Sequence, residues 1–150
     1  MVLGVILTLA LLPFVYFFIY EEKYTKFCYQ LMRFWCKGMF YGMGFSYELI
    51  KETSKNIDPN KQYIIIANHT SIMDVFLPCI LHPEHPLSYV GKKELEKIPI
   101  FGIIFKRIMV PVDRKYPQSR AEVYVKCAER IKQGKSVVIF PEGGVTDDLS

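Results

Sequence analysis

Three hydrophobic patterns follow one another along this chain of 150 residues. Residues 1–20 are apolar without interruption, and residues 21–45 mix apolar and basic positions with a helical period. From Phe45 onward, short β-branched runs alternate with amphipathic stretches, a pattern typical of a largely parallel α/β sheet. The chain is therefore predicted to have a membrane-anchoring helical segment over 1–45. It is followed by an α/β domain over 46–150, with a mostly parallel sheet flanked by helices.

The first segment, residues 1–20, carries no charged side chain. At about 1.5 Å per helical residue, it reaches the roughly 30 Å thickness of bilayer hydrocarbon. A secretory signal peptide is disfavoured, because no basic residue precedes the apolar run and no small-residue cleavage site follows it. We expect a membrane helix, and the alternative is a buried helix of a globular core.

The second segment has the pattern of a basic amphipathic helix. Its polar stripe falls within roughly 80° of a helical wheel and contains Lys23, Lys26, Gln30, Arg33 and Lys37. Such a helix lies in the membrane interface with its cations toward anionic headgroups. Packing on the protein's own sheet requires the same pattern, so both placements stay open. Basic residues after the apolar run, against none before it, predict that the body of the protein lies on the cytoplasmic side.

The α/β domain contains five predicted strands and three predicted helices. The strands are expected at 47–51, 63–67, 88–91, 108–112 and 136–140, and the helices at 71–81, 100–106 and 118–133. After residue 140 the sequence offers no helix to cover the last strand and no strand to pair with it. Because parallel sheets are normally buried on both faces, we expect this strand to be an exposed edge or to be completed by a longer chain.

The cysteines and two of the histidines give no sign of a metal site. The four cysteines, at 28, 36, 79 and 127, form no CxxC pair, as expected for reduced, packed thiols. In "HPEHP" the prolines indicate a solvent-exposed turn around His82 and His85. We therefore expect neither a disulfide nor a metal.

Candidate chemistry follows the strand at 63–67, in "NHTSIMD". On a continuous helix, His69 and Asp74 would be about 140° out of register and could not meet. They can meet if His69 lies in the loop and Asp74 in the first helical turn, with Thr70 or Ser71 as the N-cap. An aspartate on one imidazole nitrogen would leave the other as a base toward substrate. The alternative is a histidine that merely satisfies a helix end.

A protein nucleophile to accompany this base is missing from the sequence. No GxSxG occurs, and Cys79 lies within a predicted helix. A His–Asp base without an enzyme nucleophile indicates that the hydroxyl of the substrate itself attacks.

Four ordered blocks resemble a known family. "NHTSIMD", "GKKELEKIPIFG", "VPVDR" and "FPEGG" are similar to motifs of the glycerolipid acyltransferases, in particular bacterial-type 1-acylglycerol-3-phosphate acyltransferases. The resemblance implies transfer of a fatty acyl group from acyl-CoA or acyl carrier protein to a lysophospholipid hydroxyl, giving phosphatidic acid. It also implies membrane lipids as partners, no nucleic acid, no metal or redox cofactor, and a location at the bacterial inner membrane.

Site residues are carried over from the resemblance by position. His69 and Asp74 would be catalytic, as base and orienting partner. The candidate substrate-binding residues are Asn68, Arg114, Glu142, Gly143 and Gly144. Arg114 would contact the acceptor phosphate, in agreement with the bidentate fit of guanidinium to phosphate oxygens. Paired glycines would also let backbone N–H groups approach an anion.

The chain departs from the family pattern in two respects. The family commonly continues "FPEG" with Thr-Arg, whereas Gly144-Val145 stand here, so one expected phosphate-side cation is absent. Family members also usually continue for several more strands and helices, so this chain resembles the front part of a longer protein. Three alternatives stay open: a truncated, non-catalytic membrane-docking fragment, an acyltransferase for a different lysolipid, and a lipid hydrolase that uses the same base on water.

Overall fold

The computed structural model describes residues 21–52, 57–58, 60–82, 85–97, 105, 108–113 and 115–143, with positions 6, 9–11, 13–15 and 18 nearer the start. Its helices are α2 (Thr25–Gly42), α3 (Phe76–Leu81) and α5 (Pro117–Lys132), with 3-10 turns η1 (Glu22–Tyr24), η2 (Ile72–Val75) and η3 (Lys93–Lys97). Its strands are β1 (Ile64–Ile66), β2 (Leu87–Lys92), β3 (Met109–Val112) and β4 (Ser136–Ile139).

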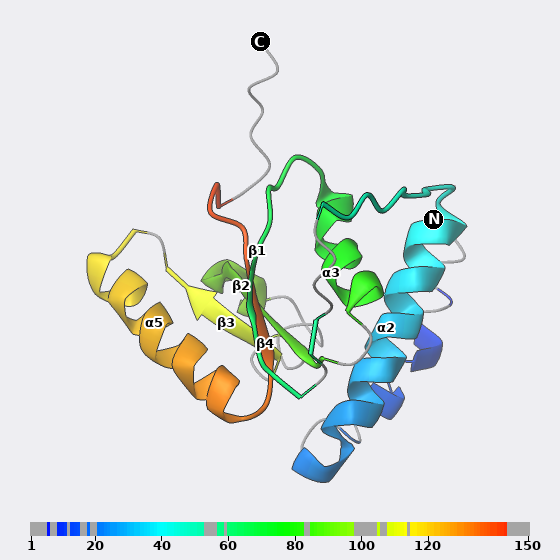
Figure 1. Cartoon of the computed structure of the whole chain (residues 1–150). Helices are drawn as coiled ribbons and strands as arrows, with labels where there is room; N and C mark the ends of the chain where they lie inside the picture. Colours follow the sequence, from blue (N-terminus) through cyan, green and yellow to red (C-terminus); the bar gives the residue numbers. More distant parts are fainter. Residues whose placement is uncertain are drawn as a thin grey trace.

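The four strands form one parallel sheet in the order β1-β4-β2-β3. Helix α5 covers one face, and α2 and α3 lie on the other (Figure 1). This arrangement confirms the predicted α/β class, with strands close to four of the five expected ranges and α5 close to 118–133. The helix expected at 71–81 is present as η2 followed by α3.

Alternating side chains of the strands build a core on each face of the sheet. Val138 and Tyr89 point toward α2 and α3, whereas Val137 and Val110 point toward Cys127 of α5. All five are buried, and Val137 and Val138 have no exposed surface. The β-branched run of β4 therefore contributes to both cores, as expected for a central parallel strand.

Helices α2 and α3 pack antiparallel. The Tyr29 hydroxyl donates to the carbonyl of His82 at 2.8 Å, whereas Trp35, later in α2, meets Phe76 at the start of α3 with ring centroids 5.6 Å apart. Packing on the protein's own core is thus part of the role of α2. The C-terminal end of α2 consequently lies near η2.

One prediction about strands is wrong, and one of the two alternatives for the last strand is excluded. Residues 47–51 form no strand: the rings of Phe45 and Tyr47 lie 5.7 and 6.2 Å from that of Phe40, so their alternation reflects contacts with α2. The strand at 136–140 is no edge either. β4 lies between β1 and β2, and α5 covers one of its faces. Sheet order decides which strand is an edge, and in the described sheet the edges are β1 and β3.

The packed state of the cysteines is confirmed, since all four are free and buried. His85 does not lie in solvent, however, because it is 5% exposed and its ring packs edge-on against Tyr63 at 5.6 Å. The "HPEHP" turn is thus partly built into the core.

Several predictions concern residues outside those described. They are most of the membrane helix at 1–20, nearly all of the helix at 100–106, and the site residues Arg114 and Gly144. Within the described ranges, no helix combines the length and apolar character needed to cross a membrane. That α2 lies in the membrane interface also stays a prediction.

Candidate active site

The candidate site lies at the carboxyl edge of the sheet, where β1 and β4 end side by side. The Ala67 N–H donates to the Ile139 carbonyl at 3.1 Å, so the two chains stay paired one residue beyond β1. The loop with His69 and the turn after Ile139 consequently leave the sheet next to each other. Two sequence blocks about 70 residues apart are thereby brought together, as parallel topology allows.

Asp74 is fixed by the backbone of the loop that carries His69. Its Oδ2 accepts hydrogen bonds from the N–H groups of Thr70 and Ser71, each at 2.7 Å. The Ser71 hydroxyl in turn accepts from the Met73 N–H at 3.2 Å, which completes a capping box. The predicted geometry is confirmed: His69 lies in the loop, Ser71 is the N-cap, and Asp74 lies in the first turn.

This fixed carboxylate faces the imidazole. His69 Nδ1 lies 3.6 Å from Asp74 Oδ2, and the two side chains are 14% and 21% exposed. The distance is slightly too long for a hydrogen bond, and buried Nδ1 has no hydrogen-bond partner among the described residues. Catalytic hydrogen bonds are often long in the absence of substrate and tighten when it binds. Because Nδ1 is buried, the exposed part of the ring belongs to its other atoms.

Phe140 covers one side of the imidazole, with ring centroids 4.6 Å apart and planes tilted by 31°. Sequence reasoning assigned no role to this residue, although it opens the "FPEGG" block. The chain then turns, since the Gly143 N–H donates to the Phe140 carbonyl at 3.0 Å and Gly143 has a φ of 76°. A positive φ suits glycine best. Exposed Glu142 and half-buried Gly143 therefore lie in the turn that follows the residue covering His69.

The described residues next to the remaining candidates lie along the same edge. Asn68 is exposed immediately before His69. β3 ends at Val112, just before Asp113 and the position of Arg114. Three strand intervals separate β1 from β3, or about 14 Å at 4.7–4.9 Å per strand. The structure thus brings Asn68 and the turn with Glu142 and Gly143 to the same end of the sheet as His69, whereas the segment that continues to Arg114 begins farther along the edge.

Two lysines lie between these ends and were not singled out from the sequence. β2 stands between β4 and β3, and it ends at Lys92, with Lys93 directly after it. Both side chains are exposed. Both lysines belong to the "GKKELEK" block, which could have indicated a functional role from the sequence. Only the sheet order shows that they lie between His69 and Asp113.

Cys79 can be excluded as the nucleophile. Its side chain has no exposed surface in the α2–α3 core. A hydrogen bond with Cys36 lowers the pKa of the Cys79 thiol, but a substrate cannot reach it.

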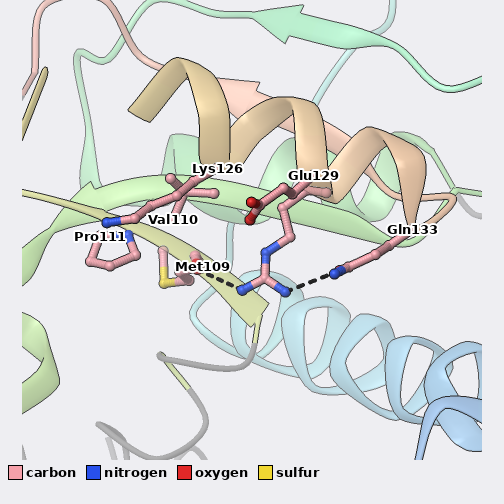
Figure 2. Close-up of a pocket in the computed structure, with 7 residues that line it drawn as sticks. Met109, Val110, Pro111, Lys126, Glu129 and Gln133 are labelled. Atoms are coloured by element: carbon pink, nitrogen blue, oxygen red, sulfur yellow. Dashed lines mark hydrogen bonds between the residues drawn. The ribbon is translucent and has the colours of Figure 1, made fainter. Parts of the chain in front are cut away.

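A separate hollow of about 150 Å³ lies along β3 and the second half of α5 (Figure 2). Arg130 is one of the residues that line it, and its guanidinium donates to the Met109 carbonyl at 3.2 Å and to Gln133 Oε1 at 3.3 Å. The guanidinium therefore occupies the free edge of β3. None of the predicted site residues lines this hollow.

Comparison with known proteins shows which family this sequence resembles. The family model described as Acyltransferase matches residues 48–150. A 1-acyl-sn-glycerol-3-phosphate acyltransferase of Helicobacter pylori (strain J99) is 32% identical over 81 residues, covering 53% of this chain and 34% of that protein. A chloroplastic 1-acyl-sn-glycerol-3-phosphate acyltransferase of Arabidopsis thaliana is 27% identical over 138 residues, covering 91% of this chain and 37% of that protein.

A third relative carries a different acceptor in its name. The lyso-ornithine lipid O-acyltransferase of Rhizobium meliloti (strain 1021) is 27% identical over 92 residues, covering 61% of this chain and 30% of that protein. The chain spans about a third of the length of these curated relatives. No solved structure matches the chain significantly. Since the family model covers more than half of the chain and includes His69, Asp74 and the turn after β4, the chain belongs to the Acyltransferase family.

Proposed function

We propose that this protein transfers a fatty acyl group from an acyl thioester, acyl-CoA or acyl carrier protein, to the free hydroxyl of a lysophospholipid. The proposed acceptor is 1-acylglycerol-3-phosphate, and the product is phosphatidic acid. The observation that carries the proposal is the His69–Asp74 pair, with Asp74 held by two backbone N–H groups at the carboxyl edge of the sheet. Family membership and the names of the relatives support it.

In the proposed reaction, His69 Nε2 accepts the hydroxyl proton as the hydroxyl oxygen attacks the thioester carbonyl carbon. The carbon–sulfur bond then breaks, and the imidazolium returns the proton to the thiolate that leaves. Asp74, on the Nδ1 side, orients the ring and stabilises the imidazolium. A positioned base of this kind contributes on the order of 10²–10⁴ in rate. A thioester is already activated, so this chemistry requires no metal or redox cofactor.

The acceptor phosphate would lie along the carboxyl edge, away from the base. We assign Arg114 to it, with Lys92 or Lys93 as the cation that the family pattern otherwise supplies after "FPEG". The two lysines lie on the interposed strand end, which is nearer to His69 than the end of β3 is. Arginine binds phosphate oxygens through two parallel N–H groups, whereas lysine acts as a point charge.

We further propose that the enzyme works at the cytoplasmic face of the bacterial inner membrane. Exposed Lys23 and Lys26 and half-buried Lys37 of the basic stripe are the cations for anionic headgroups. Arg33 is excluded from this role, because it donates to the Ile80 carbonyl at 3.4 Å. The positions of the three lysines and the core contacts of α2 are compatible, since the lysines and the buried residues Tyr29, Cys36 and Phe40 occupy different faces of the helix.

The test is acyl transfer from a labelled thioester to a panel of lysolipids, with water as the competing acceptor. Labelled phosphatidic acid should be the main product, and His69→Ala should remove it without loss of the folded state. Labelled free fatty acid as the main product would instead identify a hydrolase. Unchanged phosphatidic acid formation by His69→Ala would refute the assignment of the base.

A second acceptor is favoured by two observations. Gly144-Val145 follow Gly143 where the family commonly has Thr-Arg, and one relative is named for lyso-ornithine lipid, an acceptor without phosphate. Including lyso-ornithine lipid in the acceptor panel decides between this acceptor and 1-acylglycerol-3-phosphate. Faster transfer to it than to 1-acylglycerol-3-phosphate would replace the proposed acceptor but retain the proposed chemistry.

A further inference from the structure

Large apolar side chains are exposed at the same end of the protein as His69. We call this set the apolar rim, and its members are Met43, Phe45, Tyr47, Leu49, Ile50 and Ile72. Between 39% and 78% of each residue's surface is exposed. Such a collection is uncommon on a soluble surface and marks a site of interaction.

Contacts along α2 and α3 place the rim at the catalytic end. The two helices are antiparallel, so the last turn of α2 lies near η2, and Phe40 shares a core cluster with Met73. The Phe45 N–H donates to the Phe40 carbonyl at 3.2 Å, which turns the next residues back over this end. Ile72 lies between His69 and Asp74 in sequence and is 71% exposed. The chain after α2 runs at the end where α3 begins and β1 terminates (Figure 1).

The rim continues an aromatic stripe on the outer side of α2. Phe27, Phe34 and Tyr41 recur at seven-residue intervals, so they lie on one side of the helix, and they are 47%, 60% and 48% exposed. The basic stripe runs beside them, with exposed Lys23 and Lys26 near its start. Aromatic residues beside cations match the interface of an anionic bilayer, where rings sit at the headgroup level.

We propose that the apolar rim inserts into the surface of a lipid bilayer and turns the carboxyl edge of the sheet, with His69, toward the membrane. Insertion is shallow, because residues 45–52 form no helix or strand and their backbone polar groups need water or headgroups as partners. This inference rests on the proposed function: an enzyme that acylates a lipid would receive its acceptor directly from the membrane. It extends the docking surface from the basic stripe to the segment beside the base.

The test measures which surface contacts lipid. Leu49→Trp and Ile50→Trp are compared in the full chain, reconstituted in phosphatidylcholine–phosphatidylglycerol vesicles, with Tyr124→Trp as the control. Tyr124 lies on α5 and is 80% exposed. Trp35, the only native tryptophan, gives the same background in every variant. Lipids brominated in the acyl chain should quench the added emission of both rim variants and leave that of the control unchanged.

Two outcomes would overturn the proposal. One is equal quenching of the rim variants and the control. The other is rim tryptophans shielded from aqueous acrylamide yet not quenched by brominated lipid, since that result would indicate a covering protein segment. Both readouts are independent of activity, so they decide the inference even if no acyl transfer is found.

A kinetic measurement tests whether the apolar rim helps the enzyme to take its lysolipid acceptor from the membrane. Combined Leu49→Ser and Ile50→Ser should raise the apparent KM for a vesicle-borne lysolipid by about tenfold, from the apolar area that no longer leaves water. The KM for a short-chain lysolipid dissolved as monomers should not change. Equal increases for the two acceptors would mean that the rim shapes the acceptor site itself, which contradicts a role in docking.

Discussion

Asp74 performs two tasks in this structure, and they can be separated by substitution. Its carboxylate caps η2 through the Thr70 and Ser71 N–H groups, and it also faces Nδ1 of His69 at 3.6 Å. Asp74→Asn keeps the size of the side chain and one carbonyl oxygen for the cap. Its amide can also donate a hydrogen bond to Nδ1, which would leave the proton on Nε2 and remove the base.

The expected magnitudes differ between the two tasks. Replacing a carboxylate by an amide weakens two charge-assisted hydrogen bonds, for a loss of about 1–2 kcal/mol in the free energy of unfolding. The catalytic loss should be far larger, with kcat/KM falling by on the order of 10²–10⁴. Ser71→Ala is the matched control, because it removes the hydroxyl that accepts from Met73 and costs about 1 kcal/mol of capping energy.

The assay pairs a thermal melt with acyl-transfer kinetics for both variants. Ser71→Ala should melt earlier than the unsubstituted protein and still retain most of its kcat/KM at a temperature where it is folded. Asp74→Asn should melt close to Ser71→Ala and lose nearly all activity. If both variants lose activity in proportion to their loss of stability, Asp74 is only a cap, and the reasoning about His69 is refuted.

Three further predictions concern the acceptor, the membrane and the sheet. Arg114→Ala should raise the KM for the phosphate-bearing acceptor and leave that for the acyl donor nearly unchanged, with partial recovery in Arg114→Lys; equal rises in both constants would contradict phosphate binding. Lys26→Gln with Lys37→Gln should weaken binding to anionic vesicles by about 1 kcal/mol per charge, and binding that is unaffected at low salt would exclude an interfacial role. Ile66 is 70% exposed, so Ile66→Thr should change the melting temperature little. Ile65 faces the α2–α3 core, so Ile65→Thr should lower the melting temperature by several degrees. Similar shifts for the two variants would refute the assigned faces of β1.

Local patterns predicted the local features of this fold. Short β-branched and apolar runs located β1, β2, β3 and β4, and a helical period located α2 and α5. The five-residue spacing of His69 and Asp74 also sufficed to predict a loop histidine beside a capped first turn. That geometry depends on a few consecutive residues, which the sequence displays directly.

Features that depend on sheet order could not be predicted in this way. For the run at 136–140, an exposed edge was one of two alternatives, because the residues after it offer no partner strand, yet its neighbours β1 and β2 precede it in the chain. The same order places Phe140 on His69 and inserts Lys92 between His69 and Asp113. The strand at 47–51 failed for a related reason, since alternation of apolar residues does not show whether a partner strand exists.

The proposed role of His69 places a base on a loop, and the structure shows what holds that loop. A histidine in a flexible loop would lose rotamer freedom on reaching its catalytic geometry, at a cost in free energy. Here Phe140 covers the ring from the neighbouring strand end, and the loop backbone itself holds the carboxylate that the ring must meet. The hydrogen bonds that fold the loop therefore also set the position of Asp74, and only the 3.6 Å gap to Nδ1 is left to close. Since the second support comes from the turn after β4, assembly of the sheet and preorganisation of the base are a single event.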